Sequence, residues 1–200
     1  MGKIGAPPVN KRKPEAEVDR LLLDRWSPRA FDPTPIPEKV VKSLFEAARW
    51  SPSCFNEQPW LFMYAVTPED RALYLDLLVD QNKVWAANAP LLAFLFAHKR
   101  FAHNNRENFW NRFDCGAAWM SFSIQARLHG LYTHGMAGFH KERVCAALGV
   151  PEGDYEPVCA IAAGRYGDRD ALPEKVKENE SPNGRKPLAR VALEGKYRTF

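Results

Sequence analysis

The sequence predicts an α+β fold, and three observations support this prediction. Helical and strand-like segments alternate irregularly along the 200 residues, and only three segments are convincing strands. No GxGxxG follows a strand and no P-loop is present, so the usual phosphate-binding fingerprints of parallel α/β folds are absent. The length suits one domain with a sizeable core. We place this domain at residues 18–200, after an N-terminal arm at residues 1–17 that lacks the apolar region of a targeting peptide.

Three helices and two strands are predicted in the first half of the chain. Apolar residues follow helical spacing in three segments, at residues 18–24, 38–51 and 68–78. Pro37 followed by Glu38 is a favourable helix start, and Pro52 ends the same helix. Two segments are strand-like. Residues 60–66 are rich in β-forming side chains, and residues 91–97 form a nearly continuous apolar run, which is typical of a buried central strand.

The second half of the chain contains a long apolar helix and the third strand. Residues 114–130 carry small and apolar side chains on almost all sides, which predicts a helix buried in the domain or between subunits. Gly130 is expected just after its end. A short helix at residues 141–148 and a strand at residues 158–166 follow. Residues 168–186 are charged and interrupted by prolines, so we expect this segment to run over the surface.

The composition argues against several classes of function. The net charge is +4, and the positive side chains are dispersed apart from residues 11–13, so a phosphate-bearing small molecule fits and no nucleic-acid partner is indicated. The four cysteines lack CxxC spacing, which predicts reduced thiols in a cytoplasmic protein. The longest apolar run, residues 86–97, is too short and interrupted to span a membrane. The histidines of residues 129–140 lack zinc spacing, so no metal site is predicted.

Two guanidiniums and a hydroxyl occupy alternate positions at Arg25, Ser27 and Arg29. They point to one side if the segment is extended, and Pro28 favours an extended Ser27. Convergent donors of this kind match a phosphate or another planar anion. The alternative interpretation is a surface segment whose arginines pair with neighbouring acids.

Residues 51–60 place polar side chains between a helix and a core strand. Asn56 and Gln58 each offer hydrogen-bond donors and acceptors, and together they could bind the mixed edge of a heterocycle such as an isoalloxazine. The alternative is a turn whose amides satisfy the end of the preceding helix.

Residues 25–31 and 51–60, in this order along the chain, resemble the opening motifs of the nitroreductase family. That family has an R-x-S-x-[RK]-x-F turn before a helix that ends in P-S-S-x-N-x-Q-P-W. Two further stretches agree, at residues 114–118 and 134–139, and residues 184–188 are similar to the family's basic C-terminal phosphate motif. The resemblance implies a mixed, mainly antiparallel sheet flanked by helices, in an intertwined homodimer with FMN at the interface. The tail at residues 188–200 would cross onto the partner subunit.

The resemblance also implies roles for individual residues. Arg25, Ser27 and Arg185 would hold the FMN phosphate with help from Lys186, and Arg29 would approach the pyrimidine side of the flavin. The remaining candidate contacts are Trp26, Asn82, the backbone at Ala137 and Gly138 near flavin N5, and, from the other subunit, Pro52, Ser53, Cys54 and Asn56.

Three of these positions depart from the family pattern. Cys54 stands where serine is common, which removes a hydroxyl donor. Ala137 stands where some members have glutamate, so a carboxylate has no role there. Trp26 replaces a basic or polar residue, and the sequence assigns no function to this position.

The implied activity is that of an enzyme, an NAD(P)H-dependent nitroreductase. NAD(P)H would reduce FMN by hydride transfer and leave, and a nitroaromatic, quinone or related small acceptor would then bind the same face. No catalytic side chain is required, because the cofactor carries the chemistry. The aromatic residues 101–113 would line the acceptor pocket or pack in the dimer. The alternatives are a same-fold enzyme with another acceptor (an enone or dehalogenase-type reductase), a non-catalytic flavin-binding protein, and a basic nucleic-acid-binding module.

Overall fold

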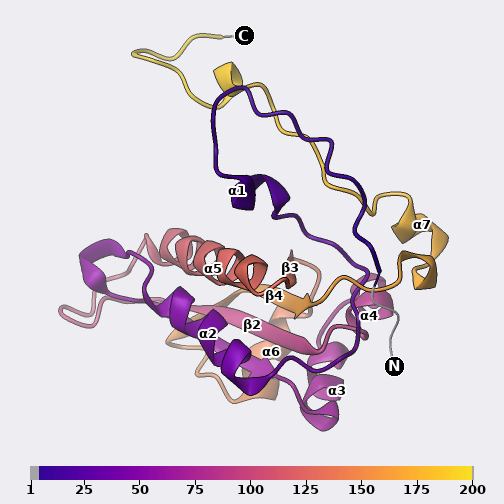
Figure 1. Ribbon diagram of the computed structural model, residues 1–200. Coiled ribbons are helices and arrows are strands. Elements are labelled where there is room, and N and C mark those ends of the chain that lie inside the picture. Colours follow the sequence, from indigo (N-terminus) through magenta and orange to yellow (C-terminus); the bar gives the residue numbers. More distant parts are fainter. Residues whose placement is uncertain (1–4, 200) are drawn as a thin grey trace.

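The computed structural model describes residues 5–199 and confirms the α+β fold (Figure 1). The first four residues of the predicted arm, and Phe200 at the end of the predicted tail, lie outside this range. Four strands form one sheet in the order β1-β2-β4-β3: β1 (Trp60–Ala65), β2 (Leu91–His98), β3 (Tyr132–Met136) and β4 (Tyr155–Gly164). All three strand pairings in the described part of the chain are antiparallel.

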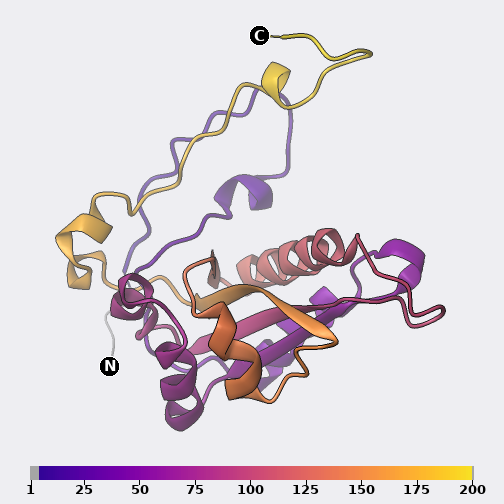
Figure 2. The same ribbon diagram turned by 180° about the vertical axis from the view of Figure 1, so that it is seen from behind.

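Helices cover both faces of the sheet. One layer contains α2 (Glu38–Arg49) and α5 (Asn111–Leu128), and the other contains α3 (Pro68–Asp76), α4 (Asp80–Ala86) and α6 (Lys141–Leu148). Figure 2 shows the second layer from behind, with α6 in orange. The remaining short helices are α1 (Arg20–Asp24), η1 (Cys54–Asn56), η2 (Arg169–Ala171), α7 (Glu174–Lys177) and η3 (Leu188–Arg190). No helix in residues 5–199 is both long and apolar enough to cross a membrane.

The apolar run of β2 is buried on both faces, as the sequence predicts. Successive side chains of a strand point to opposite faces of the sheet. The odd-numbered residues of β2 pack in the core under α2 and α5, with Leu95 fully buried, whereas Phe94 and Phe96 pack in the core under α3, α4 and α6. This central strand therefore joins the two cores.

The α5 helix buries one face and leaves the other partly exposed. Cys115, Ala118 and Phe122 are fully buried against the sheet. On the other side, Phe113 and Leu128 are 74% and 64% exposed. The helix ends as predicted, because Gly130 follows it with a φ of 71°, a conformation that favours glycine.

The prediction of only three strands is wrong, because β3 also belongs to the sheet. It is a short strand at the sheet edge, and its sequence, Tyr-Thr-His-Gly-Met, lacks the apolar signal of a core strand. Strand β4 also begins three residues earlier than expected. The sequence placed its start after Pro157, but the sheet has a bulge there, where proline is tolerated.

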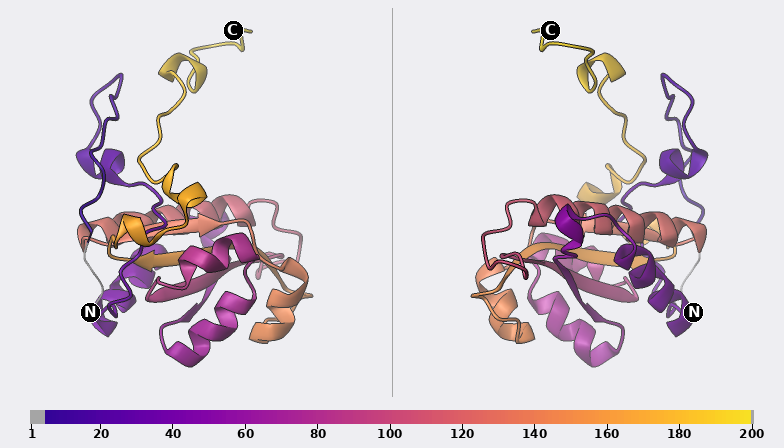
Figure 3. Two further views of the ribbon diagram at one scale, coloured as in Figure 1. Left: turned by 90° about the vertical axis from the view of Figure 1, so that its right-hand side faces the viewer. Right: turned by 90° about the vertical axis from the view of Figure 1, so that its left-hand side faces the viewer.

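The N-terminal segment around α1 and the C-terminal segment both project away from the sheet layers (Figure 3), and hydrogen bonds from Arg12 to Asn183 and from Leu188 to Glu15 join them. The expectation that residues 168–186 only run over the surface is wrong in part. Leu172 and Glu180 of this segment are 7% and 1% exposed. Glu180 is buried because it binds backbone groups of the turn after α1, which lies 150 residues earlier in the chain.

Candidate functional site

The segment after α1 alternates between partly exposed and buried residues. The side chains expected to share one side are partly exposed: Arg25, Ser27 and Arg29. The residues between them are buried: Trp26, Pro28 and Ala30. Trp26 packs against Tyr132 and Tyr166, with ring centroids 6.0 and 5.8 Å apart. Its side chain therefore belongs to the core, which leaves only its backbone for a ligand.

Arg12, Arg25 and Arg185 come together beside α1. Burial lowers the pKa of Arg25, and the charge of Arg185 lowers it further. Burial also lowers the pKa of Arg12, as do the charges of Arg185 and Arg25. Arg12, Arg185 and Lys186 line a cavity of about 770 Å³. This concentration of cations is suited to a phosphate group.

Arg29, Trp85 and His134 form the next part of the site. The guanidinium of Arg29 lies over the Trp85 ring, 5.9 Å from its centroid, and the rings of Trp85 and His134 are 4.7 Å apart. His134 Nδ1 lies 2.9 Å from the carbonyl oxygen of Pro28. Burial lowers the pKa of His134 to about 4, so the ring is neutral near pH 7.

The depressed pKa of His134 predicts a loss of stability in mild acid. In the unfolded chain histidine has its ordinary pKa near 6.5, so stabilisation from the neutral ring is present above that pH. It is lost as the pH falls from about 6.5 towards 4, by up to about 3 kcal/mol of unfolding free energy. Urea unfolding of the wild type and of His134→Gln should show a difference in stability that shrinks over this range. His129→Gln, at an exposed position, is the control, and an unchanged pH slope in His134→Gln would contradict the prediction.

The Glu180 carboxylate fixes the turn that carries Arg29. It accepts hydrogen bonds from the backbone N–H groups of Arg29 and Ala30, both at 2.9 Å from Oε1. Burial raises the pKa of Glu180, and these two hydrogen bonds oppose that shift. The C-terminal segment therefore positions a turn that precedes it by 150 residues.

Asn82 and Gly138 are in direct contact. Asn82 Nδ2 donates to the carbonyl oxygen of Gly138 at 2.9 Å, and the Val79 N–H donates to the same oxygen at 3.1 Å. A Cβ atom on Gly138 would lie 2.7 Å from Asn82 Nδ2 and 2.8 Å from Val79 Cγ2. Only glycine allows this close approach. The structure thus brings together three predicted positions: Asn82, Gly138 and Ala137, which directly precedes Gly138.

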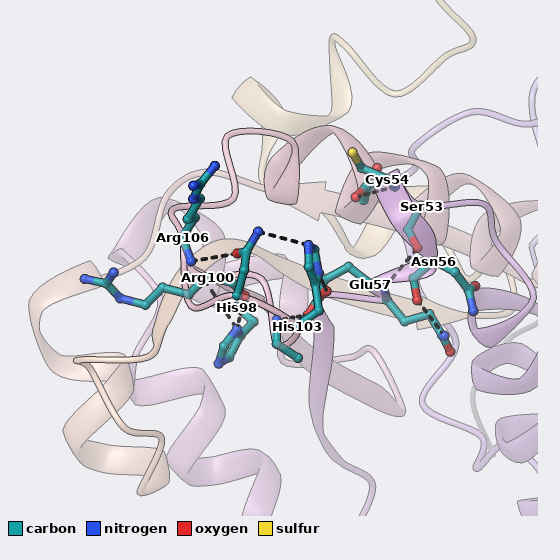
Figure 4. A network of polar contacts seen from close by, with 12 residues as sticks. Ser53, Cys54, Asn56, Glu57, His98, Arg100, His103 and Arg106 are labelled. Carbon is teal, nitrogen blue, oxygen red and sulfur yellow. Dashed lines mark hydrogen bonds and ion pairs between the residues drawn. The ribbon is translucent and has the colours of Figure 1, made fainter.

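The turn at residues 53–58 is strained and tied to α5. Phe55, Asn56 and Gln58 have φ values of 53°, 56° and 54°, a backbone conformation that residues other than glycine rarely adopt. The Cys54 N–H donates to Asp114 Oδ2 at 3.1 Å, and burial raises the pKa of this aspartate. Figure 4 shows Ser53, Cys54 and Asn56 on this turn. Such a turn presents backbone and amide groups in one defined arrangement.

The same turn is connected to the aromatic segment that follows β2. Glu57 Oε1 accepts a hydrogen bond from the Ala102 N–H at 2.7 Å, and its other oxygen lies 3.8 Å from His103 Nδ1 (Figure 4). The Phe55 ring contacts Phe101 and His103, with centroids 5.8 and 5.7 Å apart. Residues 53–58 and the beginning of segment 101–113 therefore form one unit of the surface.

Within one chain, the predicted residues form two separate groups. The Cys54 N–H donates to Asp114 in the first turn of α5, whereas α1 contacts α5 near its other end: the pKa of Asp24, next to Arg25, is lowered mainly by the hydrogen bond from Asn10 and further by the charge of Arg127 in the last turn of α5. An α-helix rises about 1.5 Å per residue, so these two contacts are roughly 20 Å apart along α5. In Figure 1, α1 lies above the sheet layers, whereas the turn before β1 lies at their left edge. One chain does not bring Arg25 and Asn56 together.

Four residues near these groups were not among the sequence candidates: Arg12, Trp85, His134 and Glu180. Arg12 lies in the basic run at residues 11–13, and His134 begins one of the family-like stretches, so each had a weak signal in the sequence. Glu180 had none, because it is one acid in a charged segment. No group of three or more metal-ligating side chains is found among residues 5–199.

Comparison with known proteins identifies related chains. A model of the nitroreductase family matches residues 22–84 and 80–165. A crystal structure described as an oxidoreductase containing FMN is 40% identical and superposes with a TM-score of 0.90 over 96% of this chain and 99% of that one.

Two curated relatives match over shorter stretches. A 15.4 kDa protein of Mycolicibacterium smegmatis is 41% identical over 85 residues, which are 42% of this chain and 56% of the relative. A Streptomyces coelicolor protein provisionally named NADH dehydrogenase/NAD(P)H nitroreductase is 32% identical over 81 residues, or 40% of each chain. The chain thus spans about half the length of these relatives.

Proposed function

Since the chain belongs to the nitroreductase family, we propose that it is an FMN-dependent oxidoreductase that passes electrons from NAD(P)H to a small acceptor. The related crystal structure is described as containing FMN, and the name of the Streptomyces relative includes NAD(P)H. The observation that carries the proposal is the grouping of Arg12, Arg25 and Arg185: Arg12 donates to the Arg25 carbonyl oxygen and lines one cavity with Arg185 and Lys186, which fits the phosphate of such a cofactor.

The arginine group has the properties of an anion site. Burial is the main cause of the lowered pKa values of Arg12 and Arg25, and repulsion between the guanidiniums lowers them further. A phosphate monoester carries up to two negative charges and would offset this repulsion. In our assignment Arg25, Ser27 and Arg185 bind the phosphate, and Lys186 contributes a further positive charge from the cavity wall.

The flavin ring would contact residues at both of its ends. Arg29 would lie at its pyrimidine side, where the Glu180 contact to the Arg29 backbone and the His134 contact to Pro28 hold the turn. Asn82 and the backbone at Ala137 and Gly138 would face the reactive end of the ring. This part is supported by the contact between Asn82 and Gly138, which leaves the Asn82 carbonyl oxygen available as an acceptor.

The third part requires a second copy of the chain. Pro52, Ser53, Cys54 and Asn56 would reach the cofactor from the partner subunit, because in one chain this turn lies at the other end of α5 from Arg25. The exposed apolar side chains of α5, such as Phe113 and Leu128, support burial of this helix between subunits. We therefore propose a homodimer with one site at each end of the interface.

FMN supplies the redox chemistry when it is bound, accepting hydride from NAD(P)H and returning electrons to an acceptor. The residues of the chain bind and orient. Arg29 would place positive charge beside the pyrimidine, where negative charge increases on reduction. His134 is neutral near pH 7 because burial lowers its pKa to about 4, so it adds no second charge behind Arg29.

The proposed acceptors are nitroaromatics or quinones. Flat aromatic molecules stack favourably on exposed aromatic side chains. Phe55 is 80% exposed and contacts Phe101 of the aromatic segment, in which Phe109 is also 80% exposed. This surface supports an aromatic acceptor over an aliphatic one.

Anaerobic stopped-flow spectroscopy tests the proposed function. The purified protein should be yellow with flavin absorbance, and mixing with NADH or NADPH should bleach this absorbance before any acceptor is added. A nitroaromatic or quinone should then restore the absorbance. Bound flavin that neither nicotinamide reduces would identify a non-catalytic flavin-binding protein instead. A colourless protein that does not take up added FMN would refute the proposal.

A further inference from the structure

Arg12 links three segments of the chain through backbone carbonyl groups. Its Nη1 donates to the carbonyl oxygens of Leu23 and Arg25 at 2.8 and 2.7 Å, and its Nε donates to that of Asn183 at 2.7 Å. Leu23 and Arg25 lie at the C-terminal end of α1, where helix carbonyl groups lack partners within the helix. One guanidinium thus connects the N-terminal arm, α1 and the C-terminal segment.

These bonds connect the two backbone segments that carry two other cations, Arg25 and Arg185. Arg25 is bonded through its own carbonyl group, and Arg185 lies two residues after Asn183. The charges of Arg25 and Arg185 repel each other, and nothing in their local sequence brings them together. The neutral carbonyl contacts of Arg12 hold the two segments close in spite of this repulsion.

Neighbouring contacts strengthen the connection. Asn10 Nδ2 donates to the Leu23 carbonyl at 2.9 Å and to Asp24 at 3.0 Å, and the Leu188 N–H donates to Glu15 at 3.1 Å. The N-terminal arm is therefore attached at several points to both α1 and the C-terminal segment. Residue 12 and residue 185 both lie outside the range that matches the family model.

We propose that Arg12 is a positioning residue that holds Arg25 and Arg185 at the spacing required by the FMN phosphate, and thereby selects FMN over riboflavin. This inference rests on the proposed function. Arg12 acts through the two arginines, since its guanidinium donates to three carbonyl groups. Its loss should weaken binding of the phosphate and leave binding of the ring unchanged.

Equilibrium binding of FMN and of riboflavin to the full-length protein, stripped of flavin, tests this inference. Arg12→Ala should raise the Kd for FMN at least about tenfold and leave the Kd for riboflavin unchanged. Arg12→Lys should behave similarly, because a single ammonium group keeps the charge but lacks the forked donors that reach three carbonyl groups. The matched control is Arg20→Ala, which removes the same charge from an exposed side chain of α1 and should change neither Kd.

Each outcome has a distinct meaning. If the wild type binds FMN and Arg12→Ala binds it equally well, the inference is wrong and the proposed function stands. If Arg12→Ala loses FMN and riboflavin to the same extent, Arg12 supports the fold in general and the positioning role is refuted. Full FMN affinity in Arg12→Lys would show that charge alone matters, which also overturns the inference. A wild-type protein that binds neither flavin would overturn the proposed function and this inference with it.

Discussion

Replacing both Arg25 and Arg185 with alanine is expected to raise the Kd for FMN by at least about a hundredfold. Hydrogen bonds to charged groups contribute about 1.5–3 kcal/mol each, and the double variant removes two guanidiniums from the proposed phosphate site. Removing the pair also ends their mutual repulsion, which offsets part of the packing lost with the partly buried Arg25 side chain. Fluorescence titration with FMN after removal of bound flavin would measure the change.

The double variant Arg49→Ala and Arg143→Ala is the matched control. It also removes two arginines, but both belong to surface ion pairs on α2 and α6, with Glu46 and Asp76. Wild-type FMN affinity is expected for this control. Retention of FMN by the Arg25 and Arg185 variant would refute the phosphate assignment.

The double variant Arg25→Ala and Arg185→Ala also tests whether the site is shared between two chains. Asn56→Ala should weaken FMN binding from the partner's side, so each variant alone would form two defective sites. A hybrid dimer contains one chain of each variant. One of its two sites would be intact, because the Asn56→Ala chain supplies Arg25 and Arg185 and the other chain supplies Asn56. Refolding the two variants together should therefore restore tight binding at one of the two sites of each hybrid. No gain over the separate variants would contradict a site shared between subunits.

Glu180→Ala is expected to lower the unfolding free energy by about 2–4 kcal/mol. Glu180 is 1% exposed, and its removal leaves the N–H groups of Arg29 and Ala30 without their acceptor in a buried position. Because this turn carries Arg29, FMN binding should weaken as well. Denaturant unfolding followed by far-ultraviolet circular dichroism would measure the stability.

Two further variants separate the effect of losing a carboxylate charge from the effect of losing the buried hydrogen-bond acceptor. Glu178→Ala removes an exposed carboxylate two residues away and should change stability by less than about 0.5 kcal/mol. Glu180→Gln keeps an acceptor oxygen for the turn and should lose less stability than Glu180→Ala. Equal stability of Glu180→Ala and Glu178→Ala would mean that the buried hydrogen bonds contribute nothing.

Much of the fold follows from local patterns in the sequence. The spacing of Val41, Leu44 and Ala48 defines the buried face of α2, and the unbroken apolar run of β2 predicts a strand covered on both faces. Helix α6 begins and ends where the sequence predicts, and Gly149 follows it with a φ of 66°. Strand β3 was missed because an edge strand needs few apolar side chains and leaves a weak signal.

The candidate site was predictable to the extent that its residues occur in short motifs. Arg25, Ser27 and Arg29 alternate in the sequence and share a side in the structure, since an extended backbone imposes a period of two. Asn82 and Gly138 are 56 residues apart, and a resemblance rather than a pattern pointed to them. Their contact depends on the packing of α4 against the loop after β3, which no local pattern encodes.

The amino-acid sequence was sufficient to predict the α+β class, the central strand, the long apolar helix and the chemical character of the two polar segments. All of these depend on side-chain type and spacing within a few residues. In contrast, the folded chain was needed to show that Arg12 and Glu180 reach the turn after α1 from opposite ends of the sequence. The folded chain also places the contacts of Cys54 and of the α1 region with α5 roughly 20 Å apart along that helix. The physical reason is that these relations arise from long-range hydrogen bonds and helix packing, which depend on the path of the whole chain.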